Sequence, residues 1–411
     1  MNARKLTHLV AAIAATGALG AFAALPQVTN VSIRQVGGKV KVSYTLSGGA
    51  AVVTADFQTN SVDKGWVSIG AENCRTLSGD VNRRVEAGNR AFSWKSRDDG
   101  AAFRFDDDGL RAVLKVHDVT QPPDWMTLEL KSGAVRYYDC EEALPGGFES
   151  DAYKTTHVLL RKIPAAGMSF LMGCCDYEGG NGGTSETSSE VQHEVILTND
   201  FYMAVYETTK AQYGAVISTY AYDAAEARFP VSSQTWYALR GANWPENGHT
   251  FGASSFFGVL AARGANLFDL PTEAQWEFAC RAGMSGVLHN GRDNVNVAAT
   301  GSDKPLEEIA WCSTVAGGAA HEVGLKKPNA WKLYDMLGNL REFCLDGHVS
   351  DLGKETVVEP VGPSGIQNRV SRGGTFVYNT SNQRIARRVN RSQSTSDQYE
   401  GFRIWGEAVA R

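Results

Sequence analysis

The sequence has few of the patterns that hold metals or cross membranes. Its eight histidines are scattered without an H-x-x-x-H pair, and none of its seven cysteines falls in a C-x-x-C spacing. These absences argue against a metal site on one helix face and against zinc-ribbon or thioredoxin-like motifs. After the first two dozen residues, no apolar run approaches the roughly 20 residues of a membrane span. The formal net charge of −5 gives no reason to expect nucleic acid or anionic lipid as a partner.

What is present indicates a globular, loop-rich protein. The chain has 411 residues, 43% of them hydrophobic and 21% charged, which is unlike the composition of disordered proteins. This length predicts two domains. The 43 glycines favour a fold rich in loops over a helical bundle.

Residues 1–24 are typical of a secretory signal peptide. Arg4 and Lys5 precede an apolar run from Leu9, and residues 21–23 fit an A-x-A cleavage site. An uncleaved anchor is the alternative, but the Ala/Gly-rich run is short and weakly hydrophobic for a span. We therefore expect a secreted, periplasmic or cell-surface protein with no membrane span after cleavage. In such a chain Cys74 and Cys140 could form a disulfide, a question that the sequence leaves open.

Residues 25–150 predict a domain of short antiparallel strands. Val40, Val42, Tyr44 and Leu46 occupy alternate positions, as in a half-buried strand. Glycine pairs such as Gly37-Gly38 mark tight turns between such runs. The pattern resembles a fibronectin or immunoglobulin-like β-sandwich, which usually serves as a spacer or interaction module.

A Gly- and charge-rich stretch at 145–155 suggests a linker, and residues 154–411 differ in texture. Two helix starts are marked by capping boxes, Thr209 with Gln212 and Thr272 with Gln275. We interpret both helices as scaffold elements and assign neither a catalytic role.

Six segments of this second region occur in a recognisable order: "IPAAGMSFLMG" (163–173), "FYMAVYETTKAQY" (201–213), "FDLPTEAQWEFACRAG" (268–283), "KKPNAWKLYDMLGNLREFCLD" (326–346), "RGGTF" (372–376) and "GFRIW" (401–405). They resemble the formylglycine-generating enzyme, or sulfatase-modifying factor, family. The resemblance implies an α+β domain of the C-type-lectin-like fold.

The family's enzymes oxidise a sulfatase cysteine with copper(I) held by two cysteine thiolates, which suit this soft ion. Here the matching positions are Tyr378 and Gln383, so the resemblance implies no copper site and a lost oxidase activity. We interpret Cys280, Cys312 and Cys344 as buried small hydrophobic residues. The alternative is a formylglycine-generating oxidoreductase that acts on a sulfatase cysteine and recruits copper in another way.

The resemblance to the family also implies one metal site. Its members bind calcium beside a segment similar to "GNLREF" (338–343), which implies Asn339 and Glu342 as oxygen ligands for Ca²⁺. The alternative is that Glu342 pairs with an arginine and Asn339 fills a turn. Both interpretations stay open at this point.

The segment 370–391 combines aromatic, amide, hydroxyl and guanidinium side chains, as ligand-binding loops do. It also resembles the variable proteins of diversity-generating retroelements, whose lectin-like domains end in a diversified stretch between similar landmarks. We expect Phe376 to Tyr378 on an exposed face that binds an unknown protein or glycan. The candidate ligand-binding residues are Thr375, Phe376, Val377, Tyr378, Asn379, Asn382, Gln383, Arg384 and Arg387. A solvated loop without a ligand, in a purely structural surface protein, is the plainer alternative.

Overall fold

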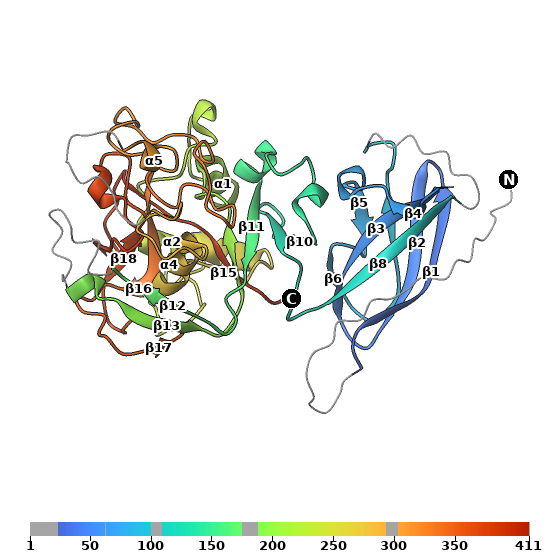
Figure 1. Ribbon diagram of the computed structural model, residues 1–411, viewed down its shortest axis with the longest axis horizontal. Coiled ribbons are helices and arrows are strands. Elements are labelled where there is room, and N and C mark those ends of the chain that lie inside the picture. The colour runs from blue at the N-terminus through green and yellow to red at the C-terminus, as the bar shows by residue number, and fades with distance from the viewer. Residues whose placement is uncertain (1–23, 62, 100–108, 175–187, 293–302, 411) are drawn as a thin grey trace. The chain divides into compact units, whose positions relative to one another are not determined.

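The computed structural model describes residues 24–61, 63–99, 109–174, 188–292 and 303–410 (Figure 1). The predicted signal peptide lies outside the described residues, apart from its last position. Contacts divide the chain into two units. The first comprises residues up to Thr127, Val135–Ser150 and the chain from Ala408, and the second comprises Leu128–Ala134 and Asp151–Glu407. In the described part of the chain, no helix is long and apolar enough to cross a membrane.

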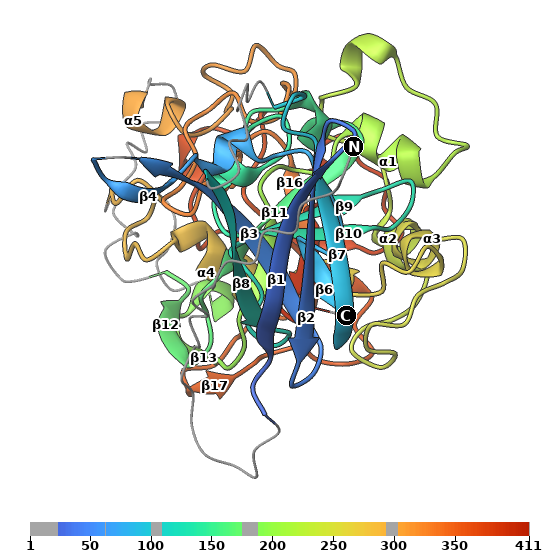
Figure 2. The ribbon, with the colours of Figure 1, turned by 90° about the vertical axis from the view of Figure 1, so that its right-hand side faces the viewer.

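The first unit is built from antiparallel strands, as the sequence predicts. One sheet has the order β1-β2-β7-β5, and β1, β2 and β7 run side by side in Figure 2. In the other sheet, β3 pairs with β4, β6 and β8. The strands are β1 (Gln27–Val36), β2 (Lys39–Ser47), β3 (Ala51–Ser61), β4 (Gly65–Ser68), β5 (Leu77–Gly79), β6 (Arg83–Val85), β7 (Gly88–Trp94), β8 (Leu110–Asp118) and β10 (Val135–Tyr138).

Alternation along β2 builds one side of this unit's core. Val40, Val42, Tyr44 and Leu46 are all buried, while the residues between them are partly exposed. The Phe57 and Trp94 rings pack against them with centroids 4.5 Å apart. The predicted strand and its core face are therefore confirmed.

Cys74 and Cys140 are free thiols in the structure. Each adjoins a short 3₁₀ turn, η1 (Ala71–Asn73) or η2 (Glu141–Ala143). Both cysteines line a pocket of about 280 Å³ within the first unit. Burial raises the pKa of the Cys74 thiol to about 12, so this group is protonated at neutral pH.

The second unit mixes short strands and short helices, so the α+β class is confirmed. Its sheets run β9-β11-β14-β21-β15, β12-β13-β17 and β19-β18-β16-β20, and the chain enters the unit within β9. The strands are β9 (Trp125–Glu129), β11 (His157–Ile163), β12 (Met168–Met172), β13 (His193–Leu197), β14 (Phe201–Ala204), β15 (Phe268–Asp269), β16 (Arg341–Gly347), β17 (Val357–Val358), β18 (Asn368–Arg372), β19 (Val389–Ser392), β20 (Glu400–Gly401) and β21 (Trp405–Glu407). The helices are α1 (Lys210–Val216), α2 (Trp236–Arg240), α3 (Phe256–Ala262), α4 (Glu273–Arg281) and α5 (Lys304–Glu307), with 3₁₀ turns η3 (Asp151–Lys154), η5 (Ser188–Glu190), η6 (Ala224–Glu226) and η7 (Thr380–Asn382).

Both predicted capping boxes are present. The Thr209 side chain accepts the Gln212 N–H at the start of α1, and Thr272 accepts the Gln275 N–H at the start of α4. In each box the glutamine side chain accepts the threonine N–H in return. These caps fix where each helix begins and so fix the side chains that follow.

Helix α4 lies in a hydrophobic core of the second unit. Its apolar face, Trp276, Ala279 and Cys280, is fully buried, as the sequence predicts. The polar side of the same helix is buried as well, since Glu273 and Glu277 are at most 3% exposed. A helix that buries carboxylates needs cationic partners, and β18 and the segment after it supply them.

Candidate functional site

Gly373 and Gly374 end β18 in a turn that requires glycine. Both have positive φ values, 95° and 77°. A Cβ on Gly373 would lie 3.0 Å from the Met336 carbonyl oxygen, and one on Gly374 would lie 2.2 Å from Oε1 of Gln383. The two glycines are therefore required by the backbone conformation of the turn and by the close approach of Gln383 to Gly374.

Three of the nine predicted ligand-binding residues are buried in this turn. Thr375 donates its hydroxyl to the Asn339 carbonyl oxygen at 3.2 Å, and Gln383 donates its amide to the Thr375 carbonyl oxygen at 2.8 Å. Phe376 is 6% exposed and packs against Leu340. The expectation of an exposed Phe376 is wrong. Thr375, Phe376 and Gln383 support the turn from inside because the chain doubles back over them.

The other six predicted residues are half-buried and are called the loop face below: Val377, Tyr378, Asn379, Asn382, Arg384 and Arg387. The Tyr378 hydroxyl accepts a hydrogen bond from Arg341 at 2.9 Å. Oδ1 of Asn379 accepts hydrogen bonds from Ser381 and Asn382, at 2.8 and 2.7 Å. These bonds hold the loop face in one conformation while leaving part of each side chain in solvent.

The residues at the two copper positions do not fit copper(I). Tyr378 offers a phenol that is bonded to Arg341, and Gln383 offers a buried amide, and neither supplies a thiolate. Burial raises the pKa of the Cys280 and Cys344 thiols, so both remain protonated. In the described ranges, no three or more His, Cys, Asp or Glu side chains are grouped to hold a metal ion.

Asn339 and Glu342 do not fit a shared calcium ion either. The Glu342 carboxylate accepts hydrogen bonds from Trp276 and from Arg403, both at 2.7 Å. Asn339 has a φ of 53°, and its amide group contacts Glu207 at 2.6 Å and the His321 N–H at 2.9 Å. The structure thus matches the alternative in which Glu342 pairs with an arginine and Asn339 occupies a turn.

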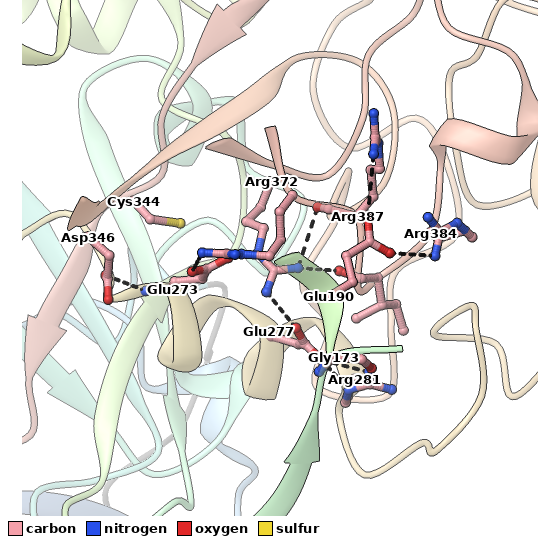
Figure 3. Close-up of polar contacts among 12 residues, drawn as sticks. Gly173, Glu190, Glu273, Glu277, Arg281, Cys344, Asp346, Arg372, Arg384 and Arg387 are labelled. Atoms are coloured by element: carbon pink, nitrogen blue, oxygen red, sulfur yellow. Dashed lines mark hydrogen bonds and ion pairs between the residues drawn. The ribbon is translucent and has the colours of Figure 1, made fainter. Parts of the chain in front are cut away.

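A buried set of ion pairs lies next to the loop face (Figure 3). Arg372 bridges Glu273 at 2.8 Å and Glu277 at 2.5 Å. Arg388 also reaches Glu273, with both nitrogen–oxygen distances below 3 Å, and Arg281 binds Glu277. Burial alone would raise the pKa of Glu273, but Arg388 and Arg372 outweigh it and lower the pKa to about 2.

Beside this set, Glu190 in η5 forms a separate group of ion pairs. Its carboxylate reaches Arg384 at 2.9 Å and Arg387 at 3.5 Å, so it joins two residues of the loop face. Arg384 also donates to the Cys174 sulfur at 3.7 Å. Neither Glu190 nor Cys174 lies in a local pattern that would indicate a role at this site. Glu277 and Arg281, four positions apart on α4, form a helix pair that is recognisable from their spacing but was not predicted.

The comparisons with known proteins agree with the six ordered segments. The family model FGE-sulfatase, the sulfatase-modifying factor enzyme 1-like domain, matches residues 165–408. The formylglycine-generating enzyme of Bos taurus is 24% identical over 290 residues, covering 62% of this chain and 74% of the relative. The chaperone protein LppX of Paenibacillus barcinonensis is 26% identical over 246 residues, covering 51% and 80%.

Among solved structures, Treponema denticola variable protein 1 is similar, with 22% identity and a TM-score of 0.47 over 61% of this chain and 96% of that protein. The family match extends over more than half of the chain and contains α4, β18 and the loop face. The chain therefore belongs to the sulfatase-modifying factor family, with a region of antiparallel β-sheets preceding the family domain.

Proposed function

We propose that this chain is an exported, non-catalytic ligand-binding or adhesion protein, whose loop face binds a protein or glycan. The observation that carries the proposal is the pair of side chains where the family's enzymes have their copper cysteines. Tyr378 is tied to Arg341, and Gln383 is buried beneath the turn. The same fold can thus hold a ligand at this place without the thiolates that oxidation needs.

The construction of the loop face supports a binding role. Its aromatic, amide and guanidinium side chains stand on buried supports, Gln383 inside the turn and Ile385 in the core. Side chains that are already ordered lose little conformational entropy when a partner binds. Ordered aromatic and amide side chains of this kind are typical of protein surfaces that bind other molecules.

An array of glycans and proteins tests the proposal. The chain without its first 24 residues is expected to bind a defined subset, and Tyr378→Ala should weaken that binding at least about tenfold, as anchor residues do. Tyr237→Ala is the matched control, because Tyr237 is an exposed tyrosine of the same unit. Equal losses in both variants, or none in either, would remove the loop face as the binding surface.

Family membership favours a second candidate, the formylglycine-generating oxidase. The chain is incubated with copper(I), oxygen and a cysteine-containing sulfatase peptide, and the peptide is weighed by mass spectrometry. We expect the cysteine to remain unchanged. Formylglycine in the peptide would overturn the non-catalytic proposal.

We also propose that the segment 372–405, which contains the loop face, is a diversified sequence. Asn379 and Asn382 are half-exposed and Asn390 is exposed, which are positions where replacement would change binding without disturbing the core. Sequencing the locus tests this directly. A near-copy of the DNA for residues 372–405 beside a reverse transcriptase gene is expected, and its absence would contradict diversification.

A further inference from the structure

A pocket in the first unit lies on the side of a sheet that faces away from that unit's core. The β3 residues Val53 and Phe57 belong to the core. Thr54 and Asp56 alternate with them along the strand, so both side chains point to the opposite side of the sheet. Lys115 of β8 lies directly across from Thr54 in the antiparallel pairing and shares that side, which is called the outer face below.

Two short turns lie against the outer face and border the pocket. Asp139, two residues before η2, accepts the Thr54 hydroxyl at 2.6 Å. Arg75, two residues after η1, donates to the Glu142 carbonyl oxygen at 2.9 Å and so joins the two turns. One face of an antiparallel sheet is commonly open to water, but here Thr54 is only 3% exposed. The space left between these turns and the strands β3, β4 and β8 is the pocket of about 280 Å³.

Asp139 is a pocket carboxylate whose charge is balanced within the chain. Besides the Thr54 hydroxyl, Nε2 of His117 contacts it at 2.8 Å and Nζ of Lys115 at 3.7 Å. Burial alone would raise the pKa of Asp139, but these partners lower it. Asp139 is therefore ionised at neutral pH and already has a cation beside it.

Asp56 is a second pocket carboxylate, and its partners are neutral. It accepts hydrogen bonds from the Ser68 hydroxyl at 2.6 Å and from the Gln58 amide at 3.0 Å. In the described part of the chain, no ion pair reaches Asp56. An ionised carboxylate has about four acceptor positions, so roughly two remain here. The described chain thus supplies no counterion to the Asp56 carboxylate.

Part of the pocket wall is apolar. Burial raises the pKa of the Cys74 thiol to about 12 and also raises that of the Cys140 thiol, so both are protonated at neutral pH. Protonated thiols act as small apolar groups. Ala71, Leu77 and Ala143 line the pocket together with them. The pocket therefore combines one carboxylate without a counterion and an apolar wall.

We propose that this pocket binds a primary alkylammonium group, with the ammonium at Asp56 and the hydrocarbon chain along the apolar wall. An ammonium group supplies three hydrogen-bond donors and the missing positive charge, and its bonds to a carboxylate are charge-assisted. Pockets for drug-sized ligands measure roughly 300–1,000 Å³, so about 280 Å³ indicates a small ligand. The pocket lies within the first unit, so this binding is separate from that of the loop face.

Isothermal calorimetry on the full chain tests the site, with n-butylammonium chloride as the probe. Sodium chloride keeps the ionic strength constant, and dithiothreitol keeps both thiols reduced. We expect saturable binding of one equivalent. n-Butanol has the same hydrocarbon chain without the charge, and it should not bind saturably. No saturable binding of n-butylammonium, or equal binding of n-butanol, would overturn the site.

Asp56→Asn should weaken n-butylammonium binding at least about tenfold, because the charge-assisted partner becomes neutral. Asp118→Asn is the matched control. Asp118 also lies in the first unit and also accepts hydrogen bonds from neutral donors, the Thr120 N–H and hydroxyl, both at 2.8 Å, but it does not line the pocket. The control should bind like the unmodified chain, and equal affinities in the two variants would remove Asp56 from the site.

Lys115→Gln provides a change of opposite sign. The Lys115 ammonium lies at the pocket, beside Asp139, and repels a second cation. Its removal should raise the affinity for n-butylammonium severalfold, whereas the loss of a merely structural contact would not. Unchanged or lower affinity in this variant would contradict the assignment of a cationic ligand.

A second probe separates two sources of the ammonium group. Nα-acetyl-lysine amide carries the same butylammonium chain as a lysine side chain of another protein. Saturable binding of both probes supports a partner's lysine as the ligand, and binding of n-butylammonium alone supports a free amine.

The loop-face variant Tyr378→Ala separates this inference from the proposed function. It should bind n-butylammonium as the unmodified chain does, whatever ligand the array identifies. A loss of amine binding in this variant would place the amine at the loop face and overturn the pocket as its site.

Discussion

Glu342 is a buried carboxylate whose charge is balanced inside the protein. It is 1% exposed and is held by Arg403, which is fully buried. Glu342→Gln should destabilise the second unit by about 3 kcal/mol, because Arg403 loses its hydrogen-bonded carboxylate and keeps only the electrostatic attraction of Glu207 and Asp335. Urea unfolding measures the loss, and added calcium should restore none of it. Recovery of stability with calcium would show that Glu342 binds a metal ion instead.

His289 makes stability depend on pH. It is buried, and in the described structure neither ring nitrogen has a hydrogen-bond partner. Burial lowers the pKa of His289 to about 4, because the interior disfavours the imidazolium. The unfolded chain takes up this proton near pH 6.5. The stability that the neutral His289 side chain contributes to the folded chain is therefore fully present above pH 6.5 and is lost as the pH falls toward 4.

His289→Phe should remove this dependence. Between pH 7.5 and pH 5 the unmodified chain should lose about 2 kcal/mol more stability than the variant, from the difference between the two pKa values. Urea midpoints at both pH values measure it. Asp346 and other acids titrate in both proteins, so the comparison isolates His289. Parallel losses in the two proteins would contradict this assignment.

At the scale of elements, the turn after β18 has a specific steric requirement. A Cβ on Gly374 would meet Gln383 and also the Asn382 carbonyl oxygen at 2.9 Å, which belongs to the backbone and cannot rotate away. Gly167 has a similar φ of 74° but no atom within 4 Å of its added Cβ. Gly167→Ala should cost about 1 kcal/mol for the left-handed conformation alone. Gly374→Ala should cost at least about 2 kcal/mol more, as overpacking does. Thermal unfolding of both variants measures the difference, and equal costs would mean that the turn can widen.

Elements set by neighbouring residues could be predicted from the sequence. The capping boxes at Thr209 and Thr272 depend on residues three positions apart, and the alternation in β2 reflects one buried face. The partners of α4 could not be predicted in this way. Glu273 meets Arg388, 115 positions later, and only the folded chain brings them together.

The residue types of the candidate site were predicted, but the burial of each residue and its distant partners were not. The sequence predicted an exposed face at Phe376 to Tyr378, and the structure leaves Tyr378 half-exposed. Phe376 was misplaced because an aromatic residue in a loop has no periodic neighbours to indicate which side faces the core. Glu190 was missed because it lies almost 200 positions from the arginines it serves.

At the scale of the whole molecule, the two units do not divide at a single point in the sequence. Leu128 and Leu130 belong to the second unit and are fully buried, although a linker near residue 150 was predicted. The Leu130 carbonyl oxygen accepts a hydrogen bond from Arg263 at 2.7 Å, and its N–H donates to the Thr156 carbonyl oxygen at 3.1 Å. A chain cut at residue 151 therefore loses part of the second unit.

This division can be tested by truncation. A chain of residues 151–411 should unfold roughly 10 °C below a chain of residues 124–411, since the loss of buried leucines costs several kcal/mol. Differential scanning calorimetry of both gives the midpoints. Equal midpoints would place the true boundary near residue 150, as the sequence suggested.

The position of β21 has a consequence for biosynthesis. In its sheet this strand lies between β14 and β15, yet it follows every other strand of that sheet in the sequence. A nascent chain still waiting for Trp405–Glu407 presents two unpaired strand edges, which invite association with other chains. Completion of this sheet must therefore wait until translation has passed Glu407, and until then the incomplete chain is exposed to association with other chains.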